Sequence, residues 1–318
     1  MAEIVLATAV KPFGDAEIAR LQLNALRSWR ALGDEVEVLV VGDEPGAREA
    51  ARQVGVGWAP HVERNAAGTP LVRSVFDAAR AISTAPLVAY ANADILLLDD
   101  FLPTASRVAT HLPAFVIVAQ RWDVRVAEEI AVAEGWTSAL RRRVEAEGRL
   151  HPPAGSDVFV FPRDCYRDLP ALAIGRAGWD NWMIYEARRR RWPVVDATRS
   201  MTVVHQEHDY RHLPGGASHH RHPESDENVR LAGGRRTILT LVDADWALGS
   251  EGLRRKGMIW RRLLREAELL PVLRTRSWLL ANAAFAVFHP LQAARRVAGW
   301  LRWKTGSQAP VLGEELPR

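Results

Sequence analysis

The chain has 318 residues, of which 48% are hydrophobic and 25% are charged, which is ordinary for a globular protein. This length suffices for one large α/β domain with an appendage, or for two modest domains. The single cysteine, Cys165, excludes an intramolecular disulfide and fits a reducing compartment, so we expect a cytoplasmic protein.

The net charge of +4 is unevenly distributed along the chain. Residues 250–304 carry twelve Lys or Arg against three Glu, an excess of nine positive charges, which leaves −5 for the remainder. This change in composition predicts a boundary near Gly249. We expect a globular α/β domain over residues 1–249, followed by a basic, tryptophan-bearing helical extension over residues 250–318.

Neither a signal peptide nor a membrane span is expected. The opening MAEIVLATAV has no basic residues ahead of its apolar run and is typical of a buried first strand. The longest uncharged apolar run, residues 278–288, is shorter than the roughly 18 to 20 residues that a membrane-spanning helix needs.

In the first 120 residues, continuous apolar runs alternate with helical patterns. Asp15 and Thr69 are suitable N-caps, Pro70 suits a first helical position, and Gly33 suits a C-cap. The alternation predicts a three-layer αβα sandwich with a mainly parallel sheet. The expected strands cover residues 4–10, 36–41, 87–90 and 115–120, and the expected helices cover 15–32, 46–54 and 69–82.

The second half is less regular. A polar loop rich in histidine is expected over residues 205–222. The patterns predict helices over residues 136–147 and 179–191, and strands over 158–161, 194–195 and 202–204.

Sheets of this kind bind ligands beyond the carboxyl ends of their strands. The fold therefore singles out three loops, Ala9-Val10-Lys11, Gly42-Asp43-Glu44 and Asn92-Ala93-Asp94. Lys11 and Arg73 are the cations that we expect at this edge, where they would touch phosphates or a nucleotide base.

Asn92 and Asp94 stand two residues apart at the end of a buried strand, so both side chains leave the same side of the chain. Such oxygen ligands suit Mg²⁺ or Mn²⁺ bridging to a diphosphate. A plain strand-end turn is an equally open reading, because Asn and Asp are common in turns.

Asp180 opens a helix between Trp179 and Trp182. It is a helix cap on one reading, and on the other a general base that takes the proton of an acceptor hydroxyl. The tryptophans favour the second reading modestly, because aromatic faces pack on sugar rings. On that reading Trp179, Asn181 and Trp182 bind the acceptor.

His205 follows a strand and could ligate a metal or donate to a diphosphate. The other histidines of the loop match no regular zinc motif and have no supporting cysteine, so zinc is not expected; they are His208, His212, His219, His220 and His222. The run Arg188–Arg191 is read as a solvated helix end.

In the basic extension, Ile259, Trp260, Leu263 and Leu264 recur at helical spacing, with arginines opposite them. A basic amphipathic stretch of this kind can lie on an anionic membrane surface. It can equally pack on the main domain with its arginines in water. Both readings stay open at this stage, whereas interleaved aromatics alone do not establish nucleic-acid binding.

With these residues in view, residues 3–215 resemble the GT-A superfamily, and within it bacterial glycosyltransferase family 2-like proteins. The resemblance rests on the early βαβ half, on Asn92-Ala93-Asp94 at the place of a DxD motif, and on Gly178-Trp179-Asp180-Asn181-Trp182. It implies transfer of a sugar from a nucleotide-sugar donor to a lipid or glycan acceptor, assisted by Mn²⁺ or Mg²⁺.

The resemblance also implies roles for individual residues. Asp94 would bind the metal, with His205 completing the metal or diphosphate site, while Asp43 would meet the nucleoside and Asp180 would be the base. Asn92 departs from the motif and removes one charge. A non-catalytic sugar-binding or nucleotide-binding relative on the inner membrane face, and a nucleotidyltransferase, remain alternatives, although the latter usually carries a Gly-rich phosphate loop that Thr8–Phe13 lacks.

Overall fold

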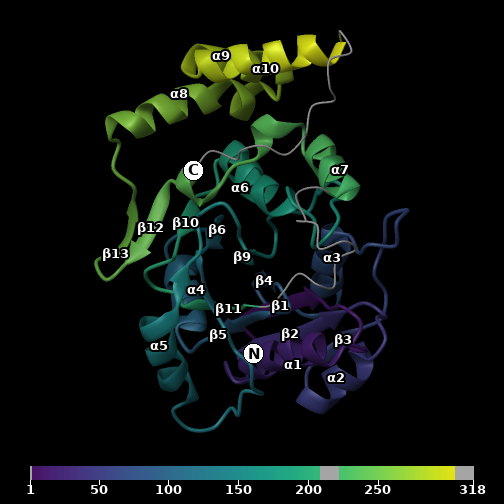
Figure 1. The fold of residues 1–318 in the computed structure, drawn as a ribbon. Helices are drawn as coiled ribbons and strands as arrows, with labels where there is room; N and C mark the ends of the chain where they lie inside the picture. The colour runs from purple at the N-terminus through teal and green to yellow at the C-terminus, as the bar shows by residue number, and fades with distance from the viewer. Residues whose placement is uncertain (1, 208–221, 305–318) are drawn as a thin grey trace.

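The computed structural model describes residues 2–207 and 222–304. They form the predicted three-layer sandwich around a nine-stranded, mainly parallel sheet (Figure 1). The strand order is β13-β12-β10-β6-β9-β4-β1-β2-β3, and all strands except β9 and β13 run in one direction. The bounds are β1 Ile4–Ala9, β2 Val36–Val41, β3 Gly57–Ala59, β4 Leu87–Ala91, β6 Val116–Val118, β9 Val158–Pro162, β10 Val194–Asp196, β12 Trp246–Gly249 and β13 Gly252–Arg255.

Both faces of this sheet are buried, which explains why its strands are continuous apolar runs. Along β1, Ile4 and Leu6 enter one core while Val5 and Ala7 enter the other. The first core is closed by α1 (Ala16–Arg30), α2 (Ala47–Val54) and α4 (Phe101–Ala109), and the second by α3 (Val72–Ile82) and α6 (Trp179–Arg190).

A small second sheet lies beside the first, in the order β5-β11-β7-β8. Parallel pairing of β11 with β7 sets His205 directly beside Asp123. Helix α5 (Trp136–Glu147) packs over this sheet through Leu140 and Val144. The strands are β5 Ile95–Leu97, β7 Arg121–Val124, β8 Arg149–Leu150 and β11 Val203–Gln206.

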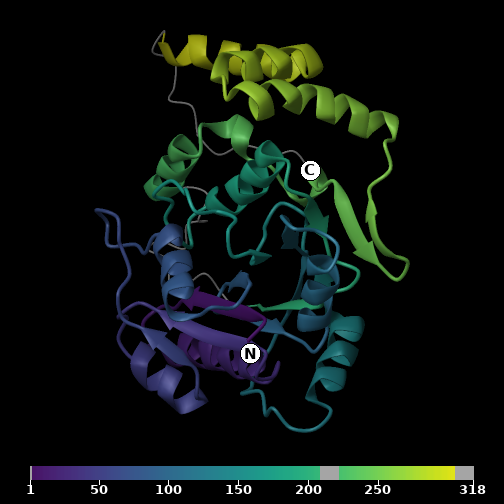
Figure 2. The ribbon, with the colours of Figure 1, turned by 180° about the vertical axis from the view of Figure 1, so that it is seen from behind.

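The C-terminal helices form a layer at one end of the molecule (Figures 1 and 2). The boundary expected at Gly249 falls on the last residue of β12, which pairs with β13, so the large sheet continues to Arg255. The remaining elements are α7 Pro223–Leu231, the short 3₁₀ helices η4 Arg235–Thr237 and η5 Leu241–Asp243, α8 Trp260–Thr275, α9 Trp278–Phe288 and α10 Pro290–Lys304.

Two predicted helix ends are wrong. Helix α3 begins at Val72 and not after Thr69, because Pro70 bridges to Arg64 and Leu71 bridges to Ala173 in extended pairing. Helix α1 ends with Ala31 as its C-cap, while Gly33 takes a positive φ of 111° two residues later in the turn to β2.

The N-cap of α1 is confirmed and can be tested. The carboxylate of Asp15 accepts hydrogen bonds from the N–H groups of Glu17 and Ile18, at 2.9 and 3.0 Å. Asp15→Ala should lower the free energy of unfolding by about 1 kcal/mol, whereas Asp15→Asn should keep most of it because asparagine caps equally well. Urea denaturation measures both, and equal losses in the two variants would contradict the capping role.

Candidate active site

The ends of β1 and β4 are tied together at the carboxyl edge of the sheet. The hydroxyl of Thr8 donates to the carbonyl of Ala91 at 2.7 Å, directly before Asn92. Lys11, just beyond β1, is close enough to Asp94 for the carboxylate to affect its pKa; burial lowers that pKa and the charge of Asp94 opposes the shift. Two of the three loops singled out from the sequence therefore meet at one place.

The turn that carries Asp94 is held by Gln206 at the end of β11. Both the backbone N–H and the side-chain Nε2 of Gln206 donate to the carbonyl of Asp94, each at 3.2 Å. Gln206 is fully buried and is itself fixed by the carbonyl of Leu21 and the amide of Asn24. The position of Asp94 is thus set by buried hydrogen bonds between α1, β4 and β11.

His205 faces Asp94 from β11. Its Nε2 lies 3.7 Å from Oδ2 of Asp94, and its Nδ1 lies 3.0 Å from Oδ1 of Asp123. An ionised carboxylate can only accept hydrogen bonds, so Nδ1 carries the proton that binds Asp123. In a neutral imidazole the lone pair then lies on Nε2, on the side of Asp94.

Asp123 is a buried carboxylate surrounded by cations and imidazoles. It binds Arg121 at 3.0 Å, His151 at 3.0 Å and Arg149 at 3.3 Å, besides His205. Burial alone would raise the pKa of Asp123, but the hydrogen bonds from His205 and His151 and the charge of Arg121 hold it far below its usual range. Asp123 therefore stays ionised and keeps His205 oriented. We call these five side chains the Asp123 cluster.

The Asp123 cluster reaches Asn92 through Asp157. Arg121 donates to Oδ2 of Asp157 at 2.7 Å, and Asn92 Nδ2 donates to Oδ1 of the same carboxylate at 2.6 Å. The hydroxyl of Tyr90 donates to Oδ1 of Asn92 at 3.0 Å. Asn92 is therefore engaged through both ends of its amide, and these contacts orient it within the site.

Asp180 lies on the other side of Asp157. Its carboxylate accepts from the backbone N–H of Ser156 at 3.3 Å. Burial raises the pKa of Asp180 to about 6; the backbone N–H of Asn181 opposes the shift, and the charge of Asp157 adds to it. Gly178 makes this placement possible, because it begins α6 with a φ of 104° and has Val229 against it where a side chain would start.

A second cation, Arg176, acts electrostatically on Lys11. It is held at 2.7 Å by Glu224, in the first turn of α7, which also binds the amide of Asn65 at 2.6 Å. Burial would raise the pKa of Glu224, but hydrogen bonds from Asn65, Thr69 and Arg176 outweigh it and lower the pKa to about 2. The site therefore has positive charge from two different segments.

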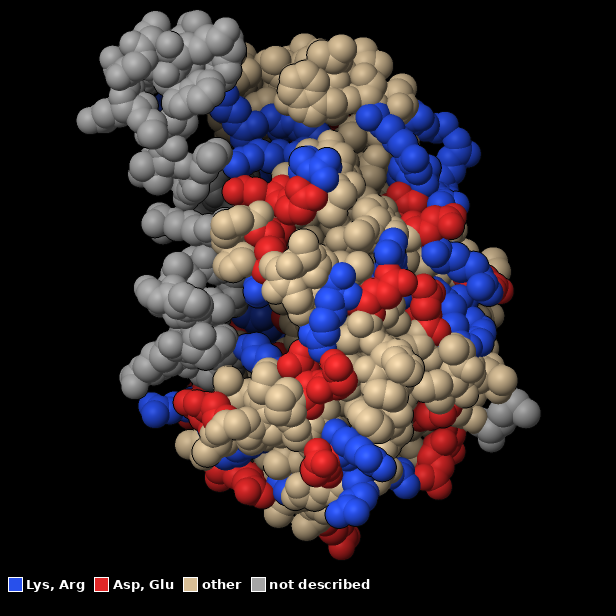
Figure 3. All heavy atoms as spheres, turned by 90° about the vertical axis from the view of Figure 1, so that its right-hand side faces the viewer, with Lys and Arg blue, Asp and Glu red and all other residues tan. Residues whose placement is uncertain are grey.

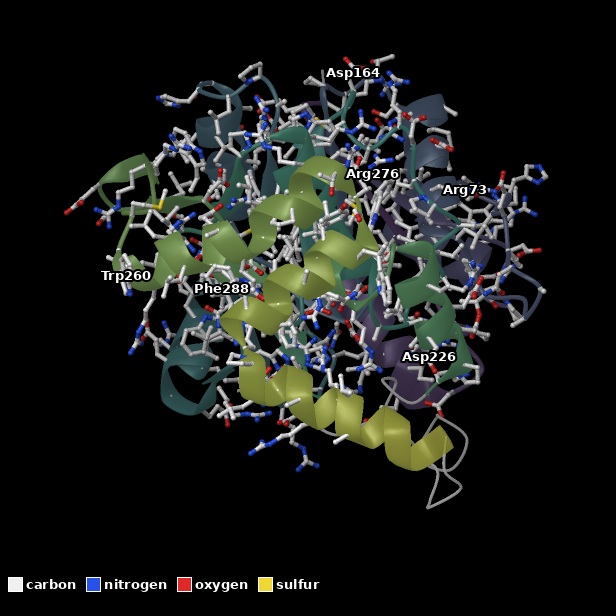
Figure 4. The ribbon with its side chains drawn as sticks, turned by 90° about the horizontal axis from the view of Figure 1, so that it is seen from above. Arg73, Asp164, Asp226, Trp260, Arg276 and Phe288 are labelled. Carbon is white, nitrogen blue, oxygen red and sulfur yellow. The ribbon has the colours of Figure 1, made fainter. Side chains whose placement is uncertain are left out.

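The remaining residues predicted to bind the donor are Ala9, Asp43 and Arg73, and the last two are engaged in ion pairs. Ala9 ends β1 at the expected edge. Asp43 is exposed and forms an ion pair with Arg64 at 2.6 Å, and that hydrogen bond lowers its pKa. Arg73 lies at the outer edge of the molecule (Figure 4) and binds Glu63 at 2.6 Å.

The predicted acceptor residues of α6 are largely core residues. Trp179 packs against Tyr90 and Phe159, with ring centroids 5.1 and 5.4 Å away, and Trp182 is equally buried. Asn181 is buried too and donates to the carbonyls of Ala154 and Leu239. The idea that the two indoles offer open faces to a sugar is therefore wrong for this structure, because packing with the sheet covers them.

The arginine run at the end of α6 is also not simply solvated. Arg188 binds Glu266 and the carbonyl of Asp243, while Arg189 and Arg190 bind Glu186. Of the loop histidines, His208, His212, His219 and His220 lie outside the described residues, and His222 caps α7. Within residues 2–207 and 222–304 no group of three or more His, Cys, Asp or Glu side chains could hold a metal ion.

Sequence reasoning missed Asp123, Asp157 and Ser156. Asp123 lies within β7, and its place shortly after the predicted strand 115–120 could have marked it. Asp157 precedes β9, and the start of a strand reaches this edge only when the strand is antiparallel, as β9 is to β4. The hydroxyl of Ser156 is buried and has no hydrogen-bond partner among the residues that the structure describes.

No protein-family model matches this chain, and no curated protein matches it in sequence. Among solved structures it is similar to a mannosyltransferase from Pyrobaculum calidifontis in complex with GDP-Man and Mn²⁺, with 13% identity, a TM-score of 0.49, and coverage of 95% of this chain and 80% of that one. It is also similar to TarS from S. aureus in complex with UDP-GlcNAc, with 12% identity, a TM-score of 0.47, and coverage of 95% and 84%.

A third similar structure is glucosyl-3-phosphoglycerate synthase from Mycobacterium tuberculosis in complex with Mg²⁺ and UDP. Its identity is 15% and its TM-score is 0.42, over 65% of this chain and 72% of that one. At 12–15% identity and TM-scores below 0.5, these matches assign neither a function nor a site residue to this chain.

The buried charge of Asp123 makes a testable contribution to stability. Asp123→Asn should lower the free energy of unfolding by about 3 kcal/mol at neutral pH, because Arg121 and the two imidazoles lose their common partner. The depressed native pKa means that this stabilisation is complete above about pH 4 and is lost as the pH falls toward the native pKa. The difference between wild type and variant should therefore shrink below pH 4.

Asp34→Asn is the control, because that carboxylate is 91% exposed. Its free energy of unfolding should stay within about 0.5 kcal/mol of the wild-type value. A penalty for Asp123→Asn that does not change between pH 7 and pH 3 would contradict the ionised role of Asp123.

Proposed function

We propose that this chain is a glycosyltransferase of the GT-A type that transfers a sugar, taken as a hexosyl group, from a nucleotide-sugar donor. The observation that carries the proposal is the pair formed by Asp94 and His205 at the end of β4, with Asp123 behind the imidazole. The positive charges of Lys11 and Arg176 suit the diphosphate of such a donor, and Asp94 and His205 would meet that diphosphate through a divalent cation.

The same pair fits a divalent cation that takes its other ligands from the donor and from water. Two ligands that each lie about 2.1 Å from one ion can be at most about 4.2 Å apart, and the Asp94–His205 separation is 3.7 Å. Asp94 and His205 would hold Mn²⁺ or Mg²⁺, which would supply positive charge to the leaving diphosphate. Because Asn92 contributes no negative charge, we expect the cation to bind the protein more tightly when the donor is present than when it is absent.

Asp180 is the proposed general base. Its pKa of about 6 leaves it ionised at neutral pH yet basic enough to accept a proton. It would take the proton of the acceptor hydroxyl while that oxygen bonds to the anomeric carbon and the bond to the diphosphate breaks, with inversion at that carbon. The buried hydroxyl of Ser156, next to the amide that binds Asp180, would orient the acceptor, which we expect to be a lipid or a glycan.

The alternative of a non-catalytic sugar-binding or nucleotide-binding relative draws on Asn92, whose amide binds Asp157 and Tyr90. A nucleotidyltransferase is less well supported, because the segment after β1 lacks glycines that would let backbone amides surround a phosphate. Hydrolysis of a panel of UDP-, GDP- and dTDP-sugars, with and without Mn²⁺, separates these functions. Absence of turnover by the wild type would favour the binding relative.

The metal and donor residues can be tested apart from turnover. Asp94→Ala and His205→Ala should each weaken Mn²⁺-dependent binding of the preferred nucleotide by about tenfold or more in calorimetry, because each removes one of two protein ligands. Arg73→Gln is the control and should leave binding unchanged, since Arg73 is engaged with Glu63 at the outer edge. Wild-type affinity in Asp94→Ala would refute the assigned site.

The base assignment predicts a pH profile. Because Asp180 acts as the ionised carboxylate, the wild-type kcat should rise with pH through an apparent pKa of about 6 and then level off. Asp180→Asn should lower kcat by roughly a hundredfold or more and remove the rise of kcat with pH, which is the acidic limb of the profile. The nucleotide affinity of this variant should stay close to that of the wild type. A variant that keeps the limb would show that another group titrates.

A further inference from the structure

Helix α8 packs on the protein through charged side chains as well as through Leu269 and Val272. Arg265 binds Asp243 of η5 at 2.8 Å and Glu268 at 3.0 Å, and Glu266 binds Arg188 of α6 at 2.6 Å. Glu268 is buried, beside Leu269 and Val272. The charged residues of α8 that the sequence pattern would place in water are therefore largely held against the main domain.

The apolar stripe of α8 consequently faces outward. Ile259, Trp260, Leu263 and Leu264 are all exposed, Trp260 by 71%. An ordinary surface helix turns its apolar stripe to the core, but in α8 only the later residues Leu269 and Val272 do so. Neither open reading of the sequence matches fully, because the helix packs on the main domain and yet leaves the apolar residues of its first turns uncovered.

Helices α9 and α10 extend the same surface. Helix α9 has no charged residue, and it packs inward through Ala281 and Phe285, which are buried. Its outer side chains are exposed, as are those of α10 up to residue 298. The resulting surface, which we call the apolar cap, consists of Ile259, Trp260, Leu263, Leu264, Leu270, Leu279, Leu280, Val287, Leu291 and Val297.

Figure 4 looks down on this layer, in which α8 runs from Trp260 toward Arg276 and α9 returns toward Phe288, on the side of Trp260. Figure 3 shows uncharged atoms gathered at this end of the molecule, with Lys and Arg beside them. Exposed apolar patches of this extent are unusual on proteins that stay in water, and they mark binding surfaces.

The charges around the apolar cap have one sign. Between residues 257 and 298 every exposed charged side chain is an arginine. The two glutamates of this stretch, Glu266 and Glu268, are turned to Arg188 and Arg265. The exposed arginines are Arg261, Arg274, Arg276, Arg295 and Arg296.

We propose that the apolar cap docks on an anionic lipid bilayer and inserts its exposed side chains into the interfacial region. An anionic surface complements the arginines, whereas a second copy of the same cap would bring like charges together. Within the described residues no helix is long and apolar enough to span a membrane, so the helices lie along the surface. The proposal does not depend on the proposed reaction.

Flotation of the full chain tests the docking, with vesicles of phosphatidylcholine alone and with about a third of phosphatidylglycerol. The wild type should bind the anionic vesicles at least about tenfold more strongly than the neutral ones. The double variant Leu279→Glu/Val287→Glu, at positions 70% and 75% exposed, should lose about tenfold or more of that binding. Ile82→Glu is the matched control on α3, where the apolar side chain is 50% exposed and outside the cap.

A second variant, Arg274→Gln/Arg295→Gln, tests charge without touching an apolar residue, and it should weaken anionic binding by about tenfold. Sedimentation is measured in parallel without lipid. The proposal is overturned if the wild type does not bind anionic vesicles, if the glutamate variant binds as the wild type does, or if the wild type is a dimer that only the glutamate variant dissociates.

Discussion

The structure depends on how a buried negative charge at Asp123 is balanced. A carboxylate taken out of water is costly unless cations and hydrogen bonds surround it. Here the partners come from β7, β8, β11 and the segment after β8, so satisfying one charge fixes the register of the small sheet against the site. The orientation of His205, the link through Arg121 to Asp157, and the placement of Asn92 all follow from that requirement.

Much of the fold could be predicted because periodicity and strand apolarity are local properties. Residues 36–41 and 136–147 form the strand and the helix that the patterns predict, with the same ends. The edge position of Asp94 follows from the same reasoning, since a parallel sheet presents its carboxyl ends together. The start of α3 did not follow, because long-range pairing of Leu71 with Ala173 holds the chain extended where the local signals favour a helix.

The candidate site was predictable only in part. Which residues belong to it depends on the direction of the strands and on the burial of side chains, as well as on residue type. Asp157 belongs to it only since β9 runs against its neighbours, which no local pattern reveals. Trp179 shows the converse, because an aromatic beside a candidate base can pack into the core instead of facing a ligand. The sequence shows that α8 has an apolar and a charged face. It does not show which face turns inward, because that depends on the distant residues Asp243 and Arg188, which pair with charged side chains of α8.

The helices that carry the apolar cap also complete the interior of the main domain. Leu269, Val272 and Ala281 belong to the same hydrophobic core as Val5 and Val88 of the central sheet. During synthesis this core cannot close until the chain has emerged beyond residue 281. The main domain is therefore not complete without the helices that carry the apolar cap, because α8 and α9 supply part of its core.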